Sequence, residues 1–77
     1  MNRTPMLNDE LVNKALPYAQ SLIAEGYRGV FDYRGHRPEV YIAKFRHIRN
    51  SNVITLFVYP TCVTLHKNGK LIKTDLS

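Results

Sequence analysis

Apolar residues recur at every third or fourth position in the N-terminal part of the chain, which is the spacing of one face of an amphipathic helix. They are Leu11, Val12, Ala15, Leu16, Ala19, Leu22 and Ile23. Asn8 is a suitable N-cap because its side chain can accept a hydrogen bond from a first-turn amide, and Gly26 can take the left-handed conformation that ends a helix. The pattern predicts a helix over residues 8–26.

Pro17 falls inside this helical pattern. Its ring displaces the carbonyl of Asn13 and it has no backbone N–H to donate, so a kink is expected at this point. The apolar positions nevertheless continue in the same register after Pro17. We therefore expect one bent helix rather than two helices.

From Tyr27 onward, β-branched and aromatic residues are grouped between turn-forming residues, which is typical of β-strands. The candidate strands cover residues 27–34, 39–48, 53–59, 62–67 and 70–74. Because short turns connect all neighbouring strands, an antiparallel order is favoured. The predicted fold is α+β, with one N-terminal Pro-kinked helix packed on a four- to five-stranded antiparallel meander sheet over residues 27–74.

Asn68-Gly69 is the strongest turn signal, since a two-residue type I′ hairpin needs positive φ at both central positions. This turn sets two pairs of residues opposite each other, namely Lys67 with Lys70 and Leu65 with Ile72. In the middle of the sheet, an even-length connection of two or four residues sets Phe45 opposite Leu56 and gives one consistently apolar face. The predicted core is Leu11, Ala15, Leu22, Ile23, Phe45, Leu56, Val58 and Leu65.

The chain has 77 residues, of which 44% are hydrophobic, and this predicts a single folded domain over residues 1–77. Cys62 is the only cysteine, which excludes an internal disulfide and fits a reducing compartment. No apolar stretch approaches the roughly 20 residues of a membrane span, and the first residues lack the pattern of a signal peptide. We therefore expect a cytoplasmic protein with no membrane partner.

Basic residues outnumber acidic residues by 11 to 6, and the excess is unevenly distributed. Residues 1–26 carry two basic and three acidic residues, whereas residues 27–77 carry nine basic and three acidic ones. The predicted sheet therefore holds the whole positive excess, which favours an anionic partner.

Alternation along the strands places Lys44, Arg46, Phe57 and Tyr59 together on the sheet face opposite the helix. Basic side chains attract phosphates, and aromatic rings stack on unpaired bases. Further basic side chains near the first and last turns extend this surface, namely Arg34, Arg37, Lys67 and Lys70. The pattern predicts a small basic nucleic-acid-binding module that prefers single-stranded DNA or RNA.

A second interpretation of the same face is a protein–protein interaction module, acting as an inhibitor or adaptor and in one version as a homodimer. In this interpretation Lys44 and Arg46 keep the face solvated, while Phe57 and Tyr59 are buried against a dimer mate or the C-terminal tail. Edge strands of an antiparallel sheet also pair with other chains. The sequence leaves both interpretations open.

Catalytic and metal-binding patterns are weak, so we expect no enzymatic activity and no cofactor. Cys62 and His66 share a face of one predicted strand, but four residues of extended chain put them about 13 Å apart, beyond proton-transfer reach. The three histidines do not have a recognised metal-ligand spacing. They are His36, His47 and His66.

Overall fold

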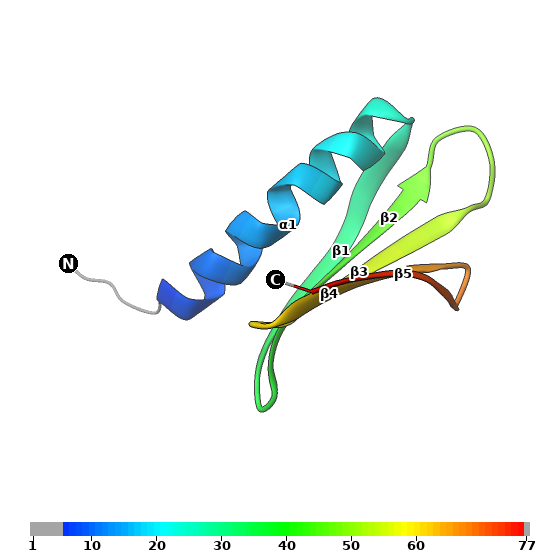
Figure 1. Cartoon of the computed structure of the whole chain (residues 1–77). Helices are drawn as coiled ribbons and strands as arrows, with labels where there is room; N and C mark the ends of the chain where they lie inside the picture. Colours follow the sequence, from blue (N-terminus) through cyan, green and yellow to red (C-terminus); the bar gives the residue numbers. More distant parts are fainter. Residues whose placement is uncertain (1–5, 77) are drawn as a thin grey trace.

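The computed structural model describes residues 6–76, which form one helix lying on one sheet (Figure 1). The helix α1 spans Met6–Ala24, and the strands are β1 (Tyr27–His36), β2 (Glu39–His47), β3 (Val53–Val58), β4 (Cys62–Lys67) and β5 (Lys70–Leu76). All neighbouring strands pair antiparallel in the order β1-β2-β3-β4-β5. The predicted α+β fold is confirmed, with five strands in the meander.

The helix α1 runs without interruption through Pro17, so one helix forms as predicted. Pro17 and Asn13 are both exposed, and the Asn13 carbonyl that loses its helical donor therefore lies where water can hydrogen-bond it. The helix begins at Met6, which places Asn8 in its first turn rather than at its cap. The Asn8 side chain lies outside the described side chains.

The C-terminal end of α1 is held by Gly26 and by a side chain from β2. Gly26 has a φ of 104°, as predicted for a residue that ends the helix. Nδ1 of His47 accepts a hydrogen bond from the Arg49 amide at 3.1 Å, so Nε2 carries the proton of the neutral ring and donates to the Glu25 carbonyl at 2.9 Å. A Cβ on Gly26 would lie 2.8 Å from His47 Nε2, and this close approach also requires glycine.

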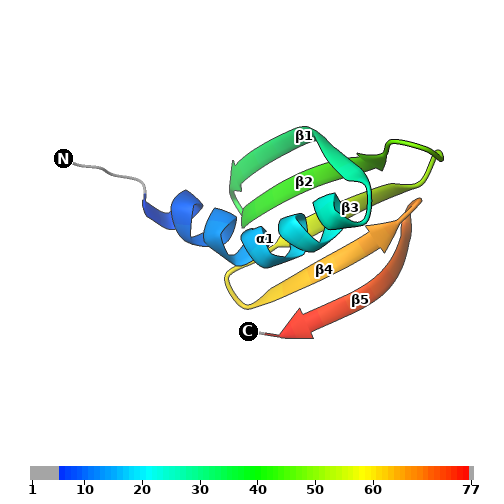
Figure 2. The ribbon, with the colours of Figure 1, turned by 90° about the horizontal axis from the view of Figure 1, so that it is seen from above.

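The hydrophobic core lies between α1 and strands β1, β2 and β3, as the view from above indicates (Figure 2). The buried apolar side chains are Leu11, Ala15, Leu22, Tyr27, Ala43, Phe45, Ile54, Leu56, Val58 and Val63, with Val40 buried outside this cluster. Most of the predicted core is therefore confirmed. Ile23 was predicted as core but is 47% exposed, because it lies at the margin of the helical stripe beside Leu16, and Leu65 is only half-buried.

The register between β2 and β3 differs from the predicted one by two residues. Phe45 pairs with Ile54 rather than with Leu56, because β2 ends at His47, one residue earlier than predicted, and the His47 amide bonds to the Asn52 carbonyl at 3.0 Å. A shift of two residues keeps every side chain on its predicted face. The consistently apolar face is therefore confirmed, although the pairing was wrong.

The β4–β5 hairpin has the predicted turn but contains an irregularity. Asn68 and Gly69 have φ of 53° and 87°, and Lys67 pairs with Lys70, as expected for a type I′ turn. A bulge in β5 then leaves Ile72 without a cross-strand partner and sets Leu65 opposite Lys73, so the predicted pair of Leu65 with Ile72 was wrong.

One hydrogen bond joins α1 to the edge strand β5. The Tyr18 hydroxyl donates to the Asp75 carboxylate at 2.5 Å, and Lys73 lies 3.7 Å from the same carboxylate oxygen. The hydrogen bond, burial and the negative charge of Asp75 all raise the pKa of Tyr18 above its ordinary value of 10.0. Because folding raises this pKa, the stabilisation is present below pH 10 and is lost as the pH rises through the folded-state pKa.

We expect Leu56→Ala to lower the free energy of unfolding by about 2 to 5 kcal/mol, because Leu56 is fully buried and the change leaves a cavity. Leu71→Ala, at a position that is 57% exposed, is the matched control and should change stability by less than about 0.5 kcal/mol. Denaturant unfolding followed by circular dichroism measures both. Equal losses in the two variants would contradict the described core.

We also expect the stability of the wild-type protein to fall more steeply above pH 10 than that of Tyr18→Phe, which has no hydroxyl to ionise beside Asp75. Tyr33→Phe, at an exposed position, serves as the control and should retain the wild-type pH profile. Urea unfolding at a series of pH values between neutral and strongly alkaline measures the effect. Parallel profiles for wild type and Tyr18→Phe would show that the hydrogen bond contributes nothing.

Candidate functional site

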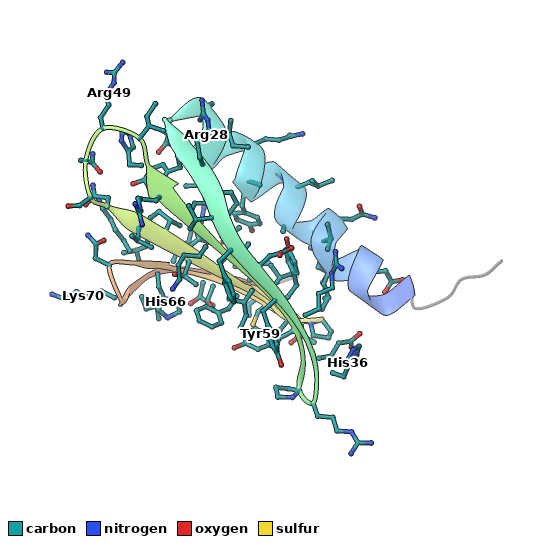
Figure 3. The ribbon with its side chains drawn as sticks, turned by 180° about the vertical axis from the view of Figure 1, so that it is seen from behind. Arg28, His36, Arg49, Tyr59, His66 and Lys70 are labelled. Carbon is teal, nitrogen blue, oxygen red and sulfur yellow. The ribbon has the colours of Figure 1, made fainter. Side chains whose placement is uncertain are left out.

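The sheet face that α1 leaves uncovered, here called the open face, carries the residues of the candidate site. Cross-strand partners share a face, and Lys44 pairs with Thr55 while Ile42 pairs with Phe57. Their chain neighbour Ala43 points into the core beneath α1. Figure 3 shows His66 on the side of the sheet away from the helix. The open face is thus built from alternate residues of β1 to β5.

A shallow hollow of about 340 Å³ lies in this face. Its side-chain lining consists of Phe31, Ile42, Lys44, Thr55, Phe57 and His66. The Lys44 ammonium group lies 5.9 Å from the centroid of the Phe31 ring. The rings of Phe57 and His66 meet edge to face with their centroids 5.0 Å apart. Aromatic surface and a positive charge therefore meet in one place.

A β-bulge in β1 brings Phe31 to this hollow. Gly29 pairs with Phe45, which faces the core, and regular alternation would place Phe31 on that same side. The register shifts between Gly29 and Phe31, so Val30 is an extra residue and Phe31 pairs with Lys44 on the open face. Phe31 was missed by sequence reasoning, although a glycine inside a strand is a known signal for a bulge.

By alternation with core residues, the four central residues predicted from the sequence lie on the side of the open face, namely Lys44, Arg46, Phe57 and Tyr59. Tyr59 directly follows β3, where its amide donates to the Cys62 carbonyl at 2.8 Å. Its half-buried side chain lines a separate pocket with Pro60 at the end of the sheet. Tyr59 therefore lies apart from the hollow.

Four basic residues that we expected to extend the nucleic-acid-binding surface do not line the hollow. They are Arg34, Arg37, Lys67 and Lys70. Arg34 pairs with Tyr41 on the helix side and stacks on its ring at 5.9 Å, and Lys67 pairs with the core residue Ile54. Lys70 pairs with Lys67 at the end of the hairpin (Figure 3), and Arg37 lies in the β1–β2 turn.

Acidic side chains of the strands all lie on the helix side by register. Asp32 pairs with Ala43 and Asp75 pairs with Val63, both of which are core residues. Glu39 alternates in step with Tyr41, which packs against the core. Over residues 27–76, the open face therefore carries cationic side chains without a carboxylate among them.

His66 places a polar atom next to this aromatic surface. Its Nδ1 is buried and has no hydrogen-bond partner within the described part of the chain. Buried polar atoms in folded proteins are normally satisfied, so this nitrogen is an exception in an otherwise well-packed sheet. His47, by comparison, uses both ring nitrogens at the end of α1 and is not available to the hollow.

No protein-family model, curated protein or solved structure matches this chain. Residues 6–76 contain no group of three His, Cys, Asp or Glu side chains placed to hold a metal ion. The helix of this part of the chain does not have the apolar length that crossing a membrane requires.

Proposed function

We propose that the open face binds single-stranded nucleic acid, with little sequence specificity and without catalysing a reaction. The observation that carries this proposal is the hollow in which the Lys44 ammonium group lies beside the exposed ring of Phe31 and close to Phe57. A nucleotide contains a phosphate group and a flat base, and this hollow offers a complementary group for each.

Stacking is the contribution of the aromatic rings. Phe31 is 55% exposed, so its ring is available to a base without any rearrangement of the core. Each base stacked on an aromatic side chain contributes about 1 to 3 kcal/mol to single-strand binding. Bases in a duplex are already paired and stacked on one another, so they cannot use the ring, and a preference for single strands follows.

Charge supplies the rest of the affinity. Lys44 and Arg46 are exposed neighbours on the open face of β2, and the carboxylates of the strands lie on the opposite side of the sheet. Phosphates that approach this face therefore meet attraction without a nearby repulsive charge. Neutralising them releases counterions, so binding should weaken as salt increases.

A different observation favours a second candidate function, which is protein–protein interaction. Large apolar side chains are exposed on both edge strands, including Tyr33 on β1 and Leu71 on β5. Exposed apolar groups beside an unpaired strand edge are typical of contact surfaces. Absence of oligonucleotide binding at low salt would favour this function over the first.

Replacing both open-face cations in the variant K44Q/R46Q should weaken binding to a labelled single-stranded oligonucleotide about tenfold or more at low salt. Since each phosphate contact contributes about 0.7 to the salt slope, losing two should lower that slope by about 1.4. Fluorescence anisotropy across a salt series measures both quantities.

The matched control is K67Q/K70Q, which removes the same charge from the β4–β5 hairpin on the helix side. This control should retain most of the wild-type affinity and slope, because neither lysine lines the hollow, although Gly69 between them does. Equal losses in the two double variants would mean that net charge alone attracts the oligonucleotide, and would reject the open face as the site.

Phe31→Ala should weaken single-strand binding by about 1 to 3 kcal/mol and change duplex binding much less, because only unpaired bases stack on the ring. Phe31→Tyr keeps an aromatic ring and should bind like the wild type. Anisotropy titrations with single-stranded and duplex oligonucleotides of the same sequence provide the comparison. An equal effect of Phe31→Ala on both would contradict stacking.

A further inference from the structure

We infer that this chain forms a symmetric homodimer in which the β1 strands of two copies pair antiparallel about Tyr33. The pairing joins the two five-stranded sheets into one continuous sheet. The partner at the β1 edge is thus a second copy of the same chain. The inference is argued from the residues of this edge and does not depend on the proposed function.

The free edge of β1 is protected only by a bulge near its start and by two residues of opposite charge, Asp32 and Arg34. β1 is the first strand in the sheet order and pairs only with β2. Figure 2 shows it along the margin of the sheet. Residues 31–35 follow the bulge in regular register and contain neither lysine nor proline, while Phe31 and Tyr33 are both more than half exposed. Such an edge is a template for another strand.

The opposite edge of the sheet is protected by comparison. β5 has a bulge at Ile72 in the middle of the strand, and its lysines Lys70 and Lys73 flank that bulge. Bulges and lysines are the common devices that prevent strands from pairing at an edge. The two edges therefore differ in the property that decides pairing, and β1 is the one that remains open.

Symmetry limits the possible registers, because a two-fold axis perpendicular to the sheet must pass through one residue paired with its own copy. With the axis at Tyr33, Asp32 lies opposite Arg34 of the second copy, and Arg34 lies opposite Asp32 of that copy. Asp32 and Arg34 share the helix side of the sheet, so these opposite charges meet directly twice. Directly opposed opposite charges stabilise antiparallel pairs.

The same register also matches the open face. Tyr33 lies opposite its own copy, and aromatic cross-strand pairs are favourable. Phe31 lies opposite Gly35 of the second copy, whose own Tyr33 ring already covers it with Cε2 3.2 Å from the Cβ position of the glycine, so the Phe31 ring meets that aromatic ring. Moving the axis to Asp32 or to Arg34 would set like charges opposite each other, which destabilises the pair. The sequence of the edge thus selects one register among the neighbouring ones.

Dimerisation in this register keeps both helices on one side and both open faces on the other. Phe31 and Tyr33 of the two copies then lie together at the centre of a doubled aromatic surface. This doubled surface gives a single strand of nucleic acid a longer binding site, and only this consequence rests on the proposed function.

Sedimentation equilibrium of the full chain without nucleic acid tests the dimer by a charge-reversal cycle. The wild type should be dimeric, and Asp32→Arg or Arg34→Asp alone should weaken the dimer about tenfold or more, because each sets like charges opposite each other twice. The double variant D32R/R34D should restore the dimer. A wild type that stays monomeric at the highest concentration reached would overturn the inference, as would a dimer that neither single reversal weakens.

A second pair of variants keeps the test independent of folding defects. Tyr33→Lys places two ammonium groups on the axis and should dissociate the dimer, whereas Leu71→Lys makes the same change on β5 at similar exposure and should leave it intact. Circular dichroism confirms that each variant is folded. Equal dissociation by both, or by neither, would reject the β1 interface.

The oligonucleotide titrations separate this inference from the proposed function. A monomer that still binds single strands would refute only the dimer. A dimer that binds no oligonucleotide at low salt would refute only the function and leave the interface standing.

Discussion

The contact between α1 and one face of the sheet is the constraint on which the rest of this structure depends. Residues 6–76 supply one helix to the sheet, and that helix lies over β1, β2 and β3. Strand side chains alternate between faces, so burying Ala43, Leu56 and Val58 beneath the helix turns their neighbours to the opposite side. The open face is therefore a consequence of how the core is packed.

The same division separates the charges and leaves the edges free. Asp32 and Asp75 lie on the helix side, where Asp75 binds the Tyr18 hydroxyl, while Lys44 and Arg46 lie on the open face. Within residues 6–76, the meander of five strands also ends in two edges, β1 and β5, each paired with one neighbour only. Charge separation supports the nucleic-acid proposal, and the difference between the two edges supports the dimer.

Local patterns in the sequence were sufficient for much of the fold. The helical spacing from Leu11 to Leu22 persisted across Pro17, which lies with Asn13 among the exposed residues of the helix. Asn68-Gly69 specified its own turn through the backbone freedom of two residues. Faces of β2 and β3 followed from alternation, which is why Lys44 and Phe57 were correctly placed together even though the pairing was wrong by two residues.

The sequence by itself thus determined the elements, their order and the faces of the regular strands, since each depends on neighbours within a few positions along the chain. Only the tertiary structure decided where the bulges fall. The bulge at Val30 turns Phe31 to the open face and Arg34 to the helix side, and the bulge at Ile72 shifts the pairing of β5. A bulge depends on how one strand fits the hydrogen bonds and side chains of the next, and alternation within a single strand does not contain that information.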